Sequence, residues 1–213
     1  MLPIVSVPRL WPDAIIVCLG SGPSLTPEDI SYLWRARAAN TNIRVIAINN
    51  TWTLARWADV LYAPDPVWWG WHGVEVARLF TGRKYTLEDN DAGVAEAAGA
   101  QRLNYKSGLG VSDDPTTIMT GGHAGYQAPQ VGVHLGARKI VLLGYDLQPD
   151  ADGRNHFFGE HPDGSHVPYD TWRDSYQALY QALIDRQIPI VNASRQTSIT
   201  AIPRVTLAAA LAQ

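Results

Sequence analysis

The feature that most constrains the fold is an apolar run that leads directly into a glycine turn. Residues 14–19 read Ala-Ile-Ile-Val-Cys-Leu, and residues 20–24 read Gly-Ser-Gly-Pro-Ser. A helix pattern follows at once, with Thr26 as its N-cap and Pro27 as its first residue. A buried strand, a glycine turn and a helix in this order can place backbone N–H groups around an anion. We therefore expect a ligand site at this turn.

Short apolar runs alternate with helical patterns along the rest of the chain. The expected strands are 14–19, 44–48, 60–63, 84–87, 139–143 and 189–191, and the expected helices are 27–39, 52–57, 67–80, 123–135, 169–186 and 205–211. Residues 88–119 are ambiguous and include a candidate strand at 102–105. This alternation predicts an α/β fold with a single Rossmann-like, doubly wound, mostly parallel sheet and helices on both faces. The polar segment 147–168 is too long for a simple connection and is expected to be a lid-like loop.

The composition fits one domain and excludes several classes of protein. The chain has 213 residues, of which 46% are hydrophobic, so we expect a single domain over 1–213. Its net charge of −3 shows no excess of basic residues of the kind that indicates binding to nucleic acid. Cys18 is the only cysteine, which excludes an internal disulfide and a zinc site built on cysteines. No apolar run reaches the roughly 18 residues of a membrane span, so we expect a cytoplasmic protein.

Polar residues follow most of the expected strands. Ligands of open parallel sheets bind beyond the carboxyl ends of the strands, so these residues are the first candidates for a site. They are Gly20, Ser21, Gly22, Ser24, Asn49, Asn50, Asp65, Tyr145, Asp146 and Asn192. A second glycine-containing turn, Thr120-Gly121-Gly122, precedes the helix expected at 123–135 and could bind a phosphate or position a sugar.

The glycine turn departs from the two best-known nucleotide-binding motifs. Leu25 stands where a dinucleotide-binding turn has its third glycine, and Pro23 has no N–H to offer. No lysine follows the glycines, so the turn is not a P-loop. Asn49 stands at the end of the second strand, where NAD-binding proteins carry an acidic residue. The alternative is that this segment is an ordinary strand–helix turn with a capping serine and binds no ligand.

Two further groups of side chains could carry chemistry. His156, His161 and His166 lie in the polar segment 147–168, and each could be a general base or acid, a metal ligand or an incidental loop residue. Their spacing is not that of zinc proteases or calcium loops, so no metal site is expected. The adjacent aromatics around Trp68 and Trp69 cannot all face one core, which makes them candidates for stacking on a base or a sugar.

In this order, the motifs resemble those of bacterial sialyltransferases that use CMP-sialic acid and of a broader Rossmann-like family around them. That family includes archaeal hydroxymethyl-dihydropterin diphosphokinases, flagellin-modifying glycosyltransferases and phage-encoded proteins. The matching stretches span nearly the whole chain: residues 20–25, 48–50, 120–122, 140–146, 159–161 and 192–194, with Ser198 and Pro203 downstream.

The resemblance implies roles for individual residues. Gly20, Ser21, Gly22, Ser24 and Asn49 would contact the nucleotide, and Asn192 would lie near it. Independently of the resemblance, Asn50, Thr120, Gly121 and Gly122 are further candidates for the nucleotide, and Asp65, Trp68, Trp69 and Tyr145 are candidates for the substrate. His161 would be the general base, with His156 as its rival, and Asp146 would lie close by. Ser21 stands where the sialyltransferases have Asn, and Pro64-Asp65-Pro66 is typical of the broader family, so transfer of sialic acid itself is not expected.

The expected function is therefore a glycosyltransferase that uses a nucleotide-activated sugar and requires no cofactor. Its acceptor is unknown and would be a glycan, a protein or a modified base, in a bacterium or a phage-infected cell. One alternative is an ATP-dependent, diphosphokinase-like transferase that needs Mg²⁺ and a carboxylate pair such as Asp65 and Asp146. Another is a non-catalytic nucleotide-binding phage accessory protein. A homo-oligomer is compatible with each of these.

Overall fold

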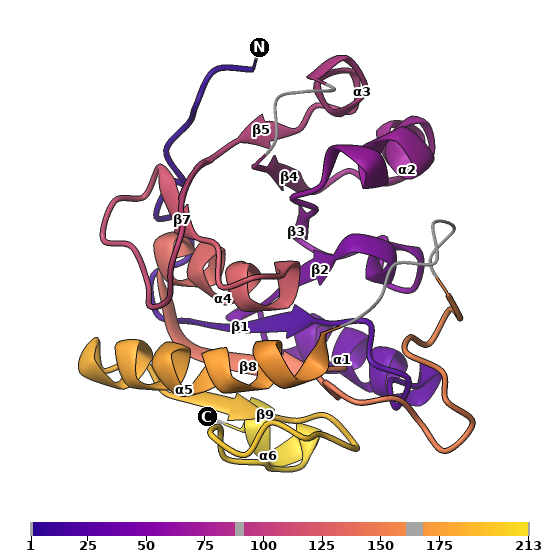
Figure 1. Cartoon of the computed structure of the whole chain (residues 1–213), viewed down its shortest axis with the longest axis vertical. Coiled ribbons are helices and arrows are strands. Elements are labelled where there is room, and N and C mark those ends of the chain that lie inside the picture. Colours follow the sequence, from indigo (N-terminus) through magenta and orange to yellow (C-terminus); the bar gives the residue numbers. More distant parts are fainter. Residues whose placement is uncertain (1, 88–91, 161–167, 213) are drawn as a thin grey trace.

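The computed structural model describes residues 2–87, 92–160 and 168–212. In this part of the chain a central sheet of seven strands is parallel throughout, in the order β5-β4-β3-β2-β1-β8-β9 (Figure 1). The strands are β1 (Ala14–Leu19), β2 (Ile43–Ile48), β3 (Val60–Tyr62), β4 (Arg83–Thr86), β5 (Gln101–Arg102), β8 (Ala137–Leu143) and β9 (Ile190–Asn192). The predicted α/β, Rossmann-like fold is confirmed.

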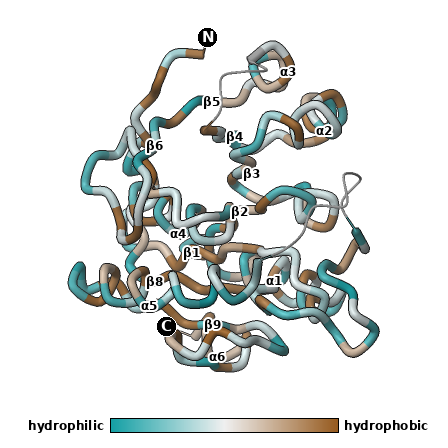
Figure 2. The backbone as a smooth tube through the Cα atoms, viewed as in Figure 1, coloured by the Kyte–Doolittle hydropathy of each residue, from teal (hydrophilic) through white to brown (hydrophobic). Residues whose placement is uncertain are grey.

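Helices cover both faces of this sheet. The core of one face contains α4 (Ala124–Leu135) and α5 (Tyr169–Asp185). The core of the other contains α1 (Pro27–Ala39), the 3₁₀ helix η1 (Asn49–Thr53), α2 (Pro66–Leu79), α3 (Ala92–Ala97) and α6 (Leu207–Leu211). Every residue of β1 is buried, because alternate side chains enter the two cores. Figure 2 shows the hydrophobic colouring along this strand. A strand covered on both faces has no polar side, which explains its uniformly apolar sequence.

Local signals explain where α1 begins. Thr26 accepts a hydrogen bond from the backbone of Asp29, and the Asp29 carboxylate accepts one from the backbone of Thr26. This capping box uses the first amides of α1, and Asp29 also pairs with Arg195 at 2.8 Å. The amino end of α1 is therefore already satisfied by side chains of the protein itself.

Other elements differ from the sequence-based expectation. The helix expected at 52–57 is instead the 3₁₀ turn η1, which starts earlier because the Thr51 hydroxyl accepts a hydrogen bond from the Ile48 amide at 2.7 Å. The ambiguous region 88–119 contains α3, β5 and a separate parallel pair, β6 (Asn104–Lys106) and β7 (Thr117–Met119). The described part of segment 147–168 contains turns and no regular element. No helix among the described residues is long and apolar enough to cross a membrane.

The strand order fixes where a ligand would bind. β1 lies between β2, which follows it through α1, and β8, which comes much later in the chain. The chain thus leaves β1 and β8 toward opposite sides of the sheet, and such a switch point opens a crevice at the carboxyl ends of the strands.

Candidate functional site

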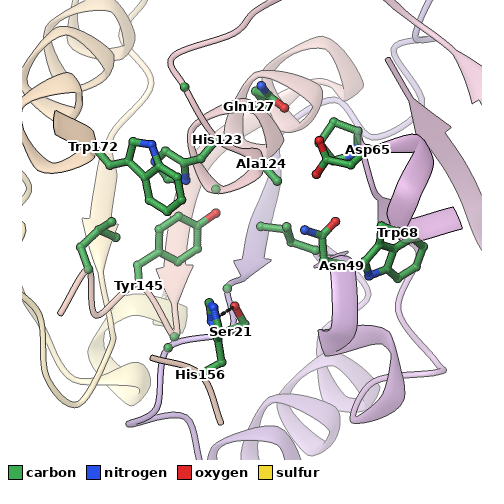
Figure 3. A pocket seen from close by; sticks show the side chains of 18 of the residues that line it. Ser21, Asn49, Asp65, Trp68, His123, Ala124, Gln127, Tyr145, His156 and Trp172 are labelled. Atoms are coloured by element: carbon green, nitrogen blue, oxygen red, sulfur yellow. Dashed lines mark hydrogen bonds between the residues drawn. The ribbon is translucent and has the colours of Figure 1, made fainter. Parts of the chain in front are cut away.

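A cavity of about 600 Å³ lies at this crevice (Figure 3). Its walls come from the segments that follow β1, β2, β3 and β8, from the amino end of α4 and from α5. The volume lies within the roughly 300–1,000 Å³ that is typical of sites for small molecules and cofactors. The position that the sequence predicted for a ligand site is therefore a real cavity.

The glycine turn after β1 is held tightly against the turn after β8. The Gly20 amide donates to Leu143 O and the Gly22 amide donates to Gly144 O, both at 2.8 Å. A Cβ on Gly20 would lie 2.6 Å from Gly144 O, and one on Gly144 would lie 2.4 Å from Gly20 O. Glycine is needed at both positions because two backbones meet there. The Gly20 and Gly22 amides are therefore used by this contact between the two turns.

Asp146 locks the same junction from the side of β8. Its carboxylate accepts hydrogen bonds from the Ser24 amide at 2.8 Å and from the Ser24 hydroxyl at 2.9 Å. The side chain is nearly inaccessible, and burial raises its pKa to about 6, although the bonds from Ser24 oppose this rise. Asp146 therefore positions the glycine turn.

We expect the raised pKa of Asp146 to make stability depend on pH. Between about pH 4 and pH 6 the folded state holds a proton that the unfolded state has released, so the free energy of unfolding falls as pH rises, by up to about 3 kcal/mol. Asp146→Asn removes this pH-dependent contribution to the free energy of unfolding. Urea unfolding from pH 4 to pH 7 should show the stability of the wild type declining relative to this variant as pH rises. A pH-independent difference between the two proteins would contradict the assignment.

The amino end of α4 offers a set of amides without hydrogen-bond partners among the described residues. Gly121 and Gly122 have φ of 51° and 93°, and they turn the chain into the helix. Tyr126 donates its amide to His123 O, whereas no hydrogen bond between described residues has the N–H of Gly122, His123, Ala124 or Gly125 as donor. All four of these residues line the cavity. Unsatisfied amides and the positive end of a helix dipole favour an anion at this point.

Gln127 fixes this turn in place. Its side-chain amide donates to Thr120 O at 2.8 Å and accepts from the Tyr62 hydroxyl at 2.9 Å. Gly121 packs against the ring of Tyr126 so closely that a Cβ there would clash with it. The second turn that the sequence singled out is thus rigidly built.

Ser21 and His156 meet at the wall of the cavity, although they are 135 residues apart in sequence (Figure 3). Ser21 Oγ lies 3.0 Å from His156 Nδ1, and the Phe157 amide donates to Ser21 O at 3.0 Å. The ring of His156 also stacks on Phe158, with centroids 4.9 Å apart. These contacts dock the described part of segment 147–168 on the glycine turn and place an imidazole in the cavity.

The wall that follows β2 and β3 is formed by Asn49 and Trp68. Asn49 adopts a positive φ of 48°, which asparagine tolerates better than most residues. Its Oδ1 is buried and has no hydrogen-bond partner within the described part of the chain. Trp68 is held by a 2.7 Å hydrogen bond from its indole N–H to Asn50 Oδ1. Asp65, the N-cap of α2, lies on the same side of the cavity (Figure 3).

The opposite wall is aromatic. His123 stacks on Trp172 with centroids 4.4 Å apart and lies 5.7 Å from the ring of Tyr176. Burial lowers the pKa of His123 to about 3, so its ring is neutral at physiological pH. Tyr145 packs edge-on against Tyr176 at 6.2 Å.

The structure brings most of the sequence-predicted residues together. Those that line the cavity are Gly20, Ser21, Gly22, Asn49, Asp65, Trp68, Thr120, Gly122, Tyr145, Asp146 and His156. Outside its lining are Ser24, Asn50, Trp69, Gly121 and Asn192. Trp69 is a core residue whose indole N–H donates to Ala63 O, and Asn192 holds the segment after β9 through Thr197 and Ser194. His161 lies outside the described residues.

Several lining residues were not predicted from sequence. Tyr169, Trp172 and Tyr176 lie on α5 with spacings of three and four residues, so they share one face of that helix. This aromatic stripe could have been recognised as a candidate wall. His123 was seen only as part of a helix start, because its contact with Trp172 depends on how α5 packs.

The charge of the cavity is unusual for a nucleotide site. Asp65 and Asp146 line it, whereas no lysine or arginine does so among the described residues. In the same part of the chain, no group of three or more His, Cys, Asp or Glu side chains is placed to hold a metal ion. Any anion bound here would therefore depend on backbone amides and other neutral donors.

Comparisons of the chain with protein-family models, with curated proteins and with solved structures gave no match. The geometry of the cavity is therefore the basis for assigning a function.

Proposed function

We propose that the protein is a glycosyltransferase that uses a nucleotide-activated sugar. The observation that carries this proposal is the combination, in one cavity, of the four unpartnered amides at α4, an imidazole at His156 and walls of aromatic rings. Sugar transfer from a nucleotide requires a site for the phosphate, a proton acceptor and surfaces on which rings can stack.

The nucleoside is assigned to the wall formed by Asn49 and Trp68. This wall follows β2 and β3, and the unpartnered Oδ1 of Asn49 suits a hydrogen bond to a base or a ribose. The indole of Trp68 provides an apolar surface next to it. The phosphate is assigned to the amino end of α4, because the Gly20, Gly22 and Ser24 amides of the glycine turn are already bonded.

His156 is assigned as the general base. In the tautomer whose Nδ1–H donates to Ser21 Oγ, the other ring nitrogen takes the proton of an acceptor hydroxyl. The acceptor oxygen attacks the anomeric carbon, and the bond from that carbon to the phosphate oxygen breaks. The leaving phosphate takes the electron pair of that bond, and the amides of α4 stabilise its charge. His161 is the rival base, and the variants described in the Discussion separate the two.

The amides of α4 can be tested by removing one of them. Ala124 is the first residue of α4, where proline is tolerated, and His123 before it is extended, as a residue preceding proline must be. Ala124→Pro deletes one N–H and should weaken binding of the tightest-binding nucleotide about 10- to 100-fold, the usual range for a hydrogen bond to a charged group. Ala124→Ser keeps the N–H and is the matched control. Titration calorimetry that gives equal affinities for both variants would contradict this placement.

A second function is favoured by the two carboxylates. Asp65 and Asp146 line the cavity, and no described lysine or arginine does. Carboxylates are the ligands that Mg²⁺ uses when it binds together with a triphosphate. An ATP- and Mg²⁺-dependent transferase would use this arrangement. Strict dependence of turnover on both ATP and Mg²⁺ would favour it over the glycosyltransferase. Tight nucleotide binding without turnover would instead favour a non-catalytic binding protein.

A further inference from the structure

The aromatic wall contains polar atoms that lack partners. His123 Nε2 and the Tyr176 hydroxyl are both shielded from solvent, and neither has a hydrogen-bond partner among the residues that the structure describes. Both residues line the cavity. Buried polar groups in folded proteins are nearly always hydrogen-bonded, so these two atoms are places where a ligand in the cavity can supply a missing bond.

The shape of this wall is set by packing. The ring of His123 is held between Trp172, which stacks on it at 4.4 Å, and Tyr176, whose ring centroid is 5.7 Å away. Tyr126 and Tyr145 pack against Tyr176 from two further sides, at 6.0 and 6.2 Å. Figure 3 shows His123 and Trp172 across the cavity from Asn49 and Trp68. The wall is therefore a rigid surface that is separate from the one assigned to the nucleoside.

The polar atoms of this wall suit an uncharged ligand. The neutral ring of His123 has one nitrogen that donates and one that accepts, and a phenol hydroxyl does both. A sugar hydroxyl also donates and accepts, and a sugar ring presents C–H groups that pack on aromatic faces. A carboxylate would find no described lysine or arginine in the cavity lining.

We propose that His123, Trp172 and Tyr176 form a subsite for an uncharged sugar ring. His123 and Tyr176 bond its hydroxyls, and Trp172 supports the ring of His123. The subsite rests on the proposed function in one respect: the bound sugar would be the sugar of the nucleotide-activated donor. A carboxylate would meet no described lysine or arginine at this wall, so a sugar that carries one should bind there more weakly than a neutral sugar.

Saturation-transfer NMR tests the subsite without a nucleotide. The probes are methyl α-D-glucopyranoside, methyl N-acetyl-β-D-glucosaminide and, as the charged comparison, the methyl glycoside of N-acetylneuraminic acid. The wild type should saturate the ring protons of at least one neutral glycoside and not those of the charged one. Tyr176→Phe and His123→Phe keep the ring volume and should each weaken binding about three- to tenfold, as expected for one hydrogen bond. Tyr85→Phe, which alters a buried hydroxyl on β4 outside the cavity lining, should have no effect.

The outcomes separate this subsite from the proposed function. If the wild type binds neither neutral glycoside, or if the two cavity variants bind as well as the wild type, the subsite is overturned, whatever the nucleotides do. A parallel thermal-shift series with CMP, UDP, GDP and dTDP tests the nucleotide site. Glycoside binding that is lost in the variants, with no shift by any nucleotide, supports the subsite and overturns only the glycosyltransferase. Binding of the charged glycoside as tightly as the neutral ones also overturns the subsite.

Discussion

Gly22→Ala should lower the free energy of unfolding by about 1–3 kcal/mol, the usual cost of overpacking. A Cβ at Gly22 would lie 2.3 Å from Asp146 Oδ1 and 2.7 Å from Gly144 O. The carboxylate of Asp146 cannot retreat without losing its two bonds from Ser24, and Gly144 O is backbone. The added methyl group must therefore push the turns after β1 and β8 apart. Urea unfolding monitored by tryptophan fluorescence measures the loss.

Gly70→Ala is the matched control for this substitution. Gly70 lies inside α2, and a Cβ there would meet no atom within 4 Å. Alanine is the better helix former, so this variant should gain about 0.5–1 kcal/mol. If Gly22→Ala is as stable as the wild type, the close packing of the two turns is wrong.

His156→Ala should reduce kcat/KM about 100- to 10,000-fold, the range typical of a lost general base. The ring is held by Ser21 and Phe158 at the cavity wall, so its removal takes the proton acceptor away and leaves the nucleotide contacts in place. The affinity for nucleotide, measured by calorimetry, should stay within about threefold of the wild type, less than the roughly 10-fold that 1.4 kcal/mol represents. Steady-state rates with the donor that the wild type turns over provide the measurement.

Two companion variants make this result specific. Asp152→Ala alters an exposed side chain in the same segment, outside the cavity lining, and should retain full activity. His161→Ala should lose less than His156→Ala. The opposite order would transfer the role of base to His161.

The fold was predictable because its signals are local. A strand such as β1 that is buried on both faces must be apolar throughout, and the Thr26 capping box marks the start of α1 within four residues. The two-residue strand β5 and the pair β6 and β7 were not resolved in advance, because such short segments carry no clear periodicity. The prediction of a helix at 52–57 was wrong, because the hydroxyl of Thr51 favours a turn directly after β2.

The site was predictable in place but not in detail. The strand order and the polar residues after the strands located the cavity. Which amides remain available could not be read from the sequence, because Ser24 finds its partner Asp146 at a separation of 122 residues. The same holds for His123, whose neutral state depends on burial by α5. The sequence motif therefore led to the cavity, whereas the bonds that use the Gly20, Gly22 and Ser24 amides could be seen only in the fold.

The most direct test of the proposed function is phosphorus NMR of nucleotide release. The wild type is incubated with CMP-, UDP-, GDP- and dTDP-activated sugars, with and without EDTA, and the phosphorus signal of the released nucleotide is followed. The proposed function predicts release from at least one donor, unaffected by EDTA and abolished by His156→Ala. Absence of release from every donor, or release of phosphate or diphosphate only with ATP and Mg²⁺, would contradict it.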